Sequence, residues 1–177
     1  MCGAAETFIK RRPLESGAGE LGKAPAKGGK AMGDVTVDDA ALFLARFESG
    51  ALGTFEATRF AAGRKNHMTF EVNGEHGSLV FDLERLNELQ YCSTRDGKTE
   101  QGFRTILATD GGHPYAGAWW PAGHMIGWEH TFTHEIFDVL SAIEARKLVK
   151  PDFEDGYRCQ SVLEAAQRSF ESKKWRR

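Results

Sequence analysis

The sequence predicts an α+β fold: a two-layer, open-faced, mostly antiparallel β-sheet with helices on one face. Short segments of alternating apolar and polar residues, separated by tight turns, fill residues 39–108, whereas two segments with a 3.6-residue period fill 128–173. Consecutive strands joined by tight turns pair antiparallel, and strands followed by helices are typical of α+β domains. Because two helices cannot cover both faces of such a sheet, one face is solvated or forms an interface.

Size and composition describe one ordinary globular domain. The chain has 177 residues, of which 41% are hydrophobic and 27% charged. The net charge of −2 gives no reason to expect a nucleic-acid or anionic-membrane partner. No apolar run approaches the roughly 20 residues of a membrane helix. The 3 cysteines are widely spaced, which fits neither a disulfide framework nor a zinc motif, and we expect a cytoplasmic protein.

The predicted strands follow the alternation. Residues 5–12 form the first, ended by Pro13, and because it starts almost at residue 1 we expect a chain cut from something longer. Residues 39–47 and 51–60 form a hairpin. The remaining strands are expected at 67–72, 78–82, 88–93 and 105–108. A sheet face carrying apolar side chains would prefer a partner to water; the candidates are Leu42, Leu44, Phe55 and Val72.

Residues 15–34 are predicted to be an exposed, mobile loop rich in glycine. The loop contains a G-x-G-x-x-G motif at 17–22, which also overlaps most of a P-loop. Both motifs bind phosphate only at a strand-to-helix turn, and here Pro25 and the two glycines that follow at 28–29 prevent a helix. Ala24 also replaces the P-loop Ser/Thr. We therefore expect no cofactor binding by this loop.

The most distinctive stretch is residues 113–147, an aromatic, histidine-rich loop that continues into an amphipathic helix at about 128–147. A second helix is expected at about 154–173. The loop region holds most of the histidines and tryptophans of the chain: His113, His124, His130, His134, Trp119, Trp120 and Trp128. If the protein binds a small molecule, we expect the site here.

No catalytic residue and no metal site is predicted. His130 and His134 share one helix face, but Thr131 stands where the metalloprotease motif needs glutamate. His130, near the helix start, is a better candidate for a hydrogen bond to a ligand. No G-x-S-x-G elbow occurs, no cysteine shows a sign of activation, and no carboxylate pair stands out.

The Trp119-Trp120 pair allows two interpretations. It is either a hydrophobic plug that seals a sheet edge or subunit contact, or a platform on which a sugar or polyol ring stacks. In the second case Arg59, Asn66 and His124 would bind the hydroxyl groups. Arg59 could equally be a salt-bridge residue at a strand end.

Several segments resemble the C-terminal domain of the glucose–fructose oxidoreductase/inositol dehydrogenase (Gfo/Idh/MocA) family. They cover nearly the whole chain in order and lie at 5–13, 56–66, 70–82, 86–90, 119–135 and 151–157. The resemblance is strongest to members that act on sugars or sugar-like polyols. It implies the open-faced sheet predicted above, a sheet face packed against another subunit in a homo-oligomer, and a whole enzyme that transfers hydride between NAD or NADP and a sugar carbon.

In that family a Rossmann domain comes first, with a catalytic lysine in an E-K-P motif, followed by a D-x-x-x-H pair; this sequence contains neither motif. The resemblance therefore implies that residues 1–177 are one substrate-binding and oligomerisation domain without its Rossmann domain. Such a chain would bind no cofactor and be inactive alone. The substrate-binding positions that it carries over are Arg59, Asn66, Trp120, His124 and His130. The alternatives are a stand-alone sugar-binding module and a structural oligomerisation fragment.

Overall fold

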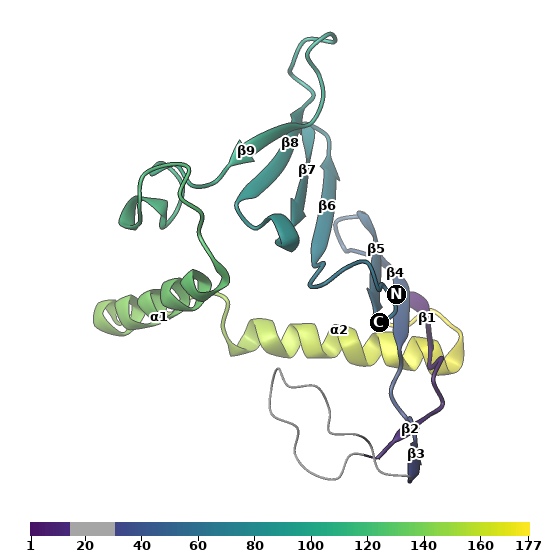
Figure 1. Ribbon diagram of the computed structural model, residues 1–177. Helices are drawn as coiled ribbons and strands as arrows, with labels where there is room; N and C mark the ends of the chain where they lie inside the picture. Colours follow the sequence, from purple (N-terminus) through teal and green to yellow (C-terminus); the bar gives the residue numbers. More distant parts are fainter. Residues whose placement is uncertain (15–30) are drawn as a thin grey trace. The chain divides into compact units, whose positions relative to one another are not determined.

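The computed structural model describes residues 1–14 and 31–177, so most of the glycine-rich loop, with its G-x-G-x-x-G motif, lies outside the described residues. The chain divides into two compact units (Figure 1). Unit 1 comprises Met1–Ala62 and Pro151–Arg177, and unit 2 comprises Gly63–Lys150. Each unit has its own antiparallel sheet and one α-helix, which confirms the predicted α+β class.

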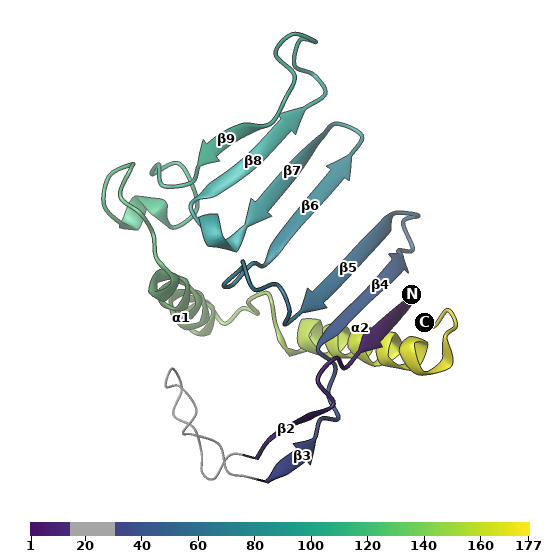
Figure 2. The same cartoon turned by 45° about the vertical axis from the view of Figure 1, so that its right-hand side comes forward.

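Unit 1 is built on a three-stranded antiparallel sheet with the order β1-β4-β5 (Figure 2). Strands β2 and β3 form a separate two-stranded ribbon. The elements are β1 (Cys2–Glu6), β2 (Arg11–Pro13), β3 (Met32–Asp34), β4 (Ala40–Arg46), β5 (Leu52–Thr58) and α2 (Phe153–Ser172). The predicted hairpin is therefore correct, and the second helix begins within one residue of its expected start.

The register of β4 on β5 defines the two faces of this sheet. Phe43 lies opposite Phe55, and their rings stack with centroids 4.7 Å apart. Leu42 lies opposite Glu56, so Leu42 and Leu44 share the other face. Phe55 therefore lies on the face of Phe43 and not on that of the leucines, because opposite residues of an antiparallel pair point to the same side.

Helix α2 packs against β1 on the face that carries Phe43. A Cβ atom added to Gly3 would lie 2.5 Å from Phe43 Cβ and 2.8 Å from the Phe170 ring. Ser169, with no exposed surface, accepts the Gly3 N–H at 3.1 Å and donates to the Lys174 carbonyl at 2.8 Å. The absence of a side chain at Gly3 thus lets the helix approach the strand closely.

The predicted first strand, 5–12, is wrong in extent, because β1 ends at Glu6 and β2 begins only at Arg11. The buried carboxylate of Asp39 accepts the Ile9 N–H at 2.9 Å and Arg12 Nη2 at 3.1 Å. The Asp39 carboxylate thus uses the Ile9 N–H, which a continuous strand would donate to the backbone of a neighbouring strand. The strand is therefore interrupted between Glu6 and Arg11.

We expect Asp39 to make unit 1 sensitive to acid. The Ile9 N–H lowers the pKa of the Asp39 carboxyl below its ordinary value against the opposing effect of burial, with further help from the Phe8 N–H and Arg12. A depressed folded-state pKa gives stability that is present above the unfolded pKa of about 3.9 and is lost as the pH falls through the folded value. Thermal unfolding from about pH 5 to about pH 3 should show this loss.

The matched variant is Asp39→Asn, which should unfold several degrees lower at neutral pH and respond less to acid than the natural chain. The control is Asp38→Asn, at an exposed neighbouring position, which should keep the acid response. An identical pH response in Asp39→Asn and the natural chain would contradict the assigned role.

Unit 2 contains an antiparallel meander in the order β6-β7-β8-β9. Its elements are β6 (Thr69–Gly74), β7 (Gly77–Asp82), the 3₁₀ turn η1 (Leu83–Arg85), β8 (Glu88–Ser93), β9 (Arg104–Leu107), the 3₁₀ turn η2 (Ala116–Ala118) and α1 (Trp128–Ala145). Each strand pairs with the next along the chain, as the short predicted turns require. None of the helices in the described part of the chain is long and apolar enough to span a membrane.

Helix α1 begins after Gly127 and ends at Ala145. The next residue, Arg146, caps the helix in the left-handed conformation. Its predicted apolar stripe is present, but each of these side chains is at least 42% exposed: Phe132, Ile136, Val139, Leu140 and Ile143. The 3.6-residue spacing of the apolar residues therefore predicts the helix correctly, but it does not predict that these side chains are buried.

Candidate functional site

A hollow of about 770 Å³ lies in unit 2 beside η1, and we call it the Asn66 hollow. One part of its lining can form hydrogen bonds or ion pairs: Lys65, Asn66, Glu84, Arg85, Asn87 and Glu88. The apolar part of the lining comes from Met125, Ile126 and Trp128, which lie just before and at the start of α1. An apolar surface with a few polar groups is typical of small-molecule sites.

Local hydrogen bonds fix the walls of this hollow. The Glu84 carboxylate accepts the backbone N–H groups of Lys65 at 2.6 Å and Asn66 at 3.1 Å. Asn87 binds the backbone of Ile126 twice: its amide nitrogen donates to the carbonyl at 2.8 Å and its oxygen accepts the N–H at 2.9 Å. Residues near 65 and near 126 are thus both held to the segment around η1.

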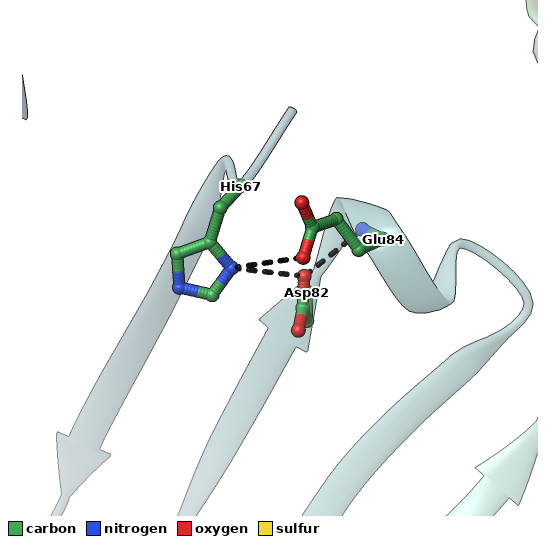
Figure 3. A group of neighbouring side chains, drawn as sticks. All are labelled: His67, Asp82 and Glu84. Atoms are coloured by element: carbon green, nitrogen blue, oxygen red, sulfur yellow. Dashed lines mark hydrogen bonds and ion pairs between the residues drawn. The ribbon is translucent and has the colours of Figure 1, made fainter. Parts of the chain in front are cut away.

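Glu84 also belongs to a compact group with His67 and Asp82 (Figure 3). The His67 Nδ1 atom lies 3.4 Å from Asp82 Oδ1 and 3.9 Å from Glu84 Oε2. The Lys65 N–H is the main cause that lowers the pKa of the Glu84 carboxyl below its ordinary value, with the Asn66 N–H, His67 and Arg64 adding to it and partial burial opposing it. Glu84 is therefore ionised at neutral pH.

A second hollow of about 530 Å³, the Tyr115 hollow, lies between η2 and α1. Tyr115 has a positive φ of 63°, its hydroxyl donates to Asp138 at 2.6 Å, and its ring stacks on His134 at 4.4 Å. The Trp119 indole N–H donates to His134 Nε2 at 2.7 Å. The bond to Asp138 is the main cause that raises the Tyr115 pKa. The polar atoms of Tyr115 and Trp119 are thus used in hydrogen bonds to Asp138 and His134. The surface left to line the hollow is largely apolar.

The two neighbouring tryptophans differ in burial. Trp119 is half-buried, with its ring edge-on to His130 at 4.4 Å. Trp120 is 75% exposed, and its ring centroid lies 6.1 Å from that of His124. His124 Nδ1 lies 2.7 Å from the Pro121 carbonyl oxygen, which can only accept, so Nδ1 is the donor.

The other predicted site residues lie in different places. Asn66 lines the hollow named after it, and His130 Nδ1 accepts the N–H of Gly127, another lining residue, at 3.1 Å. Arg59 belongs to unit 1, where its backbone N–H donates to the Asp39 carbonyl at 2.9 Å. The structure thus brings Trp120 and His124 together and places Arg59 in the other unit.

Four residues at the Asn66 hollow were not predicted from the sequence: His67, Asp82, Glu84 and Asn87. The predicted hairpin with its turn at 73–77 could have indicated two of them, because it pairs the start of one strand with the end of the next, and Thr69 lies opposite Asp82. Tyr115 was not predicted either, because its left-handed conformation has no sequence signature. The histidines at 130 and 134 use one ring nitrogen each for Gly127 and Trp119, as described above.

The profile described as "Oxidoreductase family, C-terminal alpha/beta domain" matches residues 12–176. The chain belongs to the Gfo/Idh/MocA oxidoreductase family. It corresponds to the C-terminal domain of that family, as the resemblance implied.

Relatives support this membership. Levoglucosan dehydrogenase of Pseudarthrobacter phenanthrenivorans is 39% identical over 170 residues, covering 96% of this chain and 43% of the relative. An oxidoreductase domain protein from Kribbella flavida is 47% identical with a TM-score of 0.89, covering 99% of this chain and 44% of that structure. A levoglucosan dehydrogenase complex with NADH and L-sorbose is 36% identical with a TM-score of 0.86, covering 98% and 43%. The chain thus spans less than half the length of these relatives.

The described residues do not fit the phosphates of a nicotinamide dinucleotide. Such a site needs a helix N-terminus directly after a strand and a glycine-rich turn. Helix α2 instead begins with the acidic residues Asp152, Glu154 and Asp155, and α1 follows a long loop and carries Glu129 in its first turn. These carboxylates would repel a pyrophosphate at both places.

Proposed function

We propose that this chain forms the substrate side of an NAD-dependent dehydrogenase that acts on a sugar or a sugar-like polyol. The observation that carries the proposal is the 39% identity to levoglucosan dehydrogenase, whose solved complexes contain NADH together with levoglucosan or L-sorbose. In this proposal the cofactor site and the proton acceptor belong to the part of the relatives that the chain does not span. This chain then contributes binding and orientation of the substrate.

The proposed substrate wall combines the Asn66 hollow with the loop before α1. An Asn66 amide can both donate to and accept from sugar hydroxyls, and an exposed indole such as Trp120 can stack on the C–H face of a sugar ring. His124 donates from Nδ1 to the Pro121 carbonyl, so the Nε2 atom of its neutral ring can accept; His130 accepts at Nδ1, so its Nε2 can donate. The two histidines thus provide hydroxyl partners of both kinds, while the role of Arg59, in unit 1, stays a prediction.

The exposed sheet face of unit 1 supports a second part of the proposal, a homo-oligomer. Leu42, Leu44 and Leu52 share this face, and they are 56%, 52% and 71% exposed. Contiguous apolar side chains on a sheet face are typical of subunit interfaces. The cytoplasmic location stays a prediction.

Thermal unfolding of the chain with levoglucosan, L-sorbose, a polyol panel, NAD and NADP tests the proposal. We expect a sugar or polyol to stabilise the chain, by about 1.4 kcal/mol at tenfold its Kd, and neither cofactor to do so. Asn66→Ala and Trp120→Ala should each remove most of this shift. The matched control is Asn73→Ala, in the β6–β7 hairpin away from the hollow, which should keep the full ligand shift.

Two outcomes would contradict parts of the proposal. Stabilisation by NAD or NADP would show that the chain itself binds the cofactor. A chain that responds to no sugar but sediments as a stable oligomer would instead favour the structural oligomerisation module, for which the exposed leucine face is the supporting observation.

A further inference from the structure

We propose that His67, Asp82 and Glu84 bind one divalent transition-metal cation, with Zn²⁺ as the ion that fits best. The three side chains come from one end of the β6–β7 hairpin: His67 precedes β6, Asp82 is the last residue of β7 and Glu84 lies in η1. Figure 3 shows their polar ends pointing toward one another. Each offers one ligand atom, and these atoms all lie within 4.8 Å of one another.

The separations between the ligand atoms suit a small cation. Zn²⁺ binds imidazole nitrogen and carboxylate oxygen at about 2.0–2.2 Å, so two ligands of a tetrahedral site lie about 3.3–3.6 Å apart. The His67 Nδ1 atom lies 3.4 Å from Asp82 Oδ1 and 3.9 Å from Glu84 Oε2. An ion between the three atoms therefore needs only small side-chain movements, and water can complete the coordination.

Besides the spacing of the ligand atoms, the surroundings of His67 Nδ1 also point to a bound ligand. This atom is buried and has no hydrogen-bond partner in the described part of the chain, where no other buried side-chain nitrogen or oxygen is left without one. Buried polar atoms without partners are rare in folded proteins. A metal ion at the Nδ1 lone pair would satisfy this atom.

The two carboxylates are already held in place by the backbone. Asp82 Oδ1 accepts the Glu84 N–H at 2.9 Å, and Glu84 Oε1 accepts the N–H groups of Lys65 and Asn66. These bonds leave Glu84 Oε2 as the atom nearest to His67. Hydrogen bonds that orient the ligands in this way are the usual support of metal sites in proteins. The ion would thereby fix the Lys65–Asn66 edge of the Asn66 hollow.

Two positive groups compete with a cation at this position. The Arg64 Nη1 atom lies 3.6 Å from Glu84 Oε2, but this side chain is 53% exposed and can move into solvent. A proton on His67 Nδ1 would also compete, because a metal needs the lone pair of this nitrogen. Imidazole also favours Zn²⁺ over Mg²⁺ and Ca²⁺, which prefer oxygen ligands alone.

The test is titration calorimetry of the full, chelator-treated chain with ZnCl₂, together with thermal unfolding. We expect one Zn²⁺ per chain, a midpoint raised by several degrees and reversed by chelator, and binding by Mg²⁺ at least tenfold weaker. His67→Gln and Glu84→Gln should each weaken Zn²⁺ binding at least tenfold; the second keeps a carbonyl oxygen for the Lys65 and Asn66 amides. The matched control is His76→Gln, at an exposed hairpin position, which should bind as the natural chain does.

The proposal is overturned if the natural chain binds no Zn²⁺. It is also overturned if Zn²⁺ binds equally well to His67→Gln, which would place the ion on other histidines or on a cysteine. Neither result depends on sugar binding, so this test and the test of the proposed function fail independently.

Discussion

Replacing Gly77 by alanine is expected to destabilise unit 2 by about 3 kcal/mol or more. A Cβ atom at this position would lie 2.2 Å from the Cys92 carbonyl oxygen, in the backbone of the neighbouring strand β8. Gly77 also has a positive φ of 154°, a conformation that residues with a side chain rarely adopt. Gly77 in β7 and the Cys92 carbonyl in β8 both belong to the sheet backbone. Neither strand can therefore move away without breaking the β7–β8 hydrogen bonds.

The other glycine of the same turn provides the control. A Cβ atom at Gly74 would contact only the Gly77 carbonyl, at 3.7 Å, so Gly74→Ala should change stability by less than about 1 kcal/mol. Urea unfolding of both variants, with hydrogen exchange of the β7 and β8 amides, measures the difference. If the two variants unfold at the same urea concentration, the close approach of β7 to β8 is not as described.

Replacing Ser169 by alanine is expected to destabilise unit 1 by about 1–3 kcal/mol. The serine hydroxyl is fully buried and bonds at the same time to the Gly3 N–H and the Lys174 carbonyl. Alanine fills nearly the same space, so the loss comes from two backbone groups that no longer have a partner. These groups join β1 to the C-terminal end of α2.

Ser161→Ala is the matched control, because Ser161 lies on an exposed part of the same helix, where its hydroxyl donates only to the Tyr157 carbonyl at 3.0 Å. Its effect should stay within about 0.5 kcal/mol. Chemical unfolding measures both variants, and hydrogen exchange of the β1 amides should rise in Ser169→Ala alone. Unchanged β1 protection in that variant would rule out the hydroxyl as the link between strand and helix.

Local patterns of the sequence determined most secondary-structure elements. The strand at 88–93 agrees with β8 in both bounds, and both helices begin within one residue of the prediction. The exception was the first strand, where the competitor for the backbone N–H of Ile9 is the carboxylate of Asp39, thirty residues away. Alternation along a segment carries no information about such a distant partner.

The candidate site could be predicted only in part. Composition and resemblance selected the loop before α1 and Asn66, but not the separation of the two tryptophans into a half-buried Trp119 and an exposed Trp120. Alternate residues in a loop have no fixed direction, in contrast to those of a strand or helix. That separation depends on the hydrogen bond from Trp119 to His134, in the second turn of α1.

The sequence alone thus determined the α+β class, the order of strands and helices, and the family, because each follows from residues that are close together or from motifs read in order. The tertiary structure alone decided which side chains meet. His67 is fifteen residues from Asp82 in the chain, yet the antiparallel pairing of β6 with β7 brings their polar atoms to 3.4 Å. Such a meeting of side chains depends on the register of the paired strands, which is a property of the folded chain.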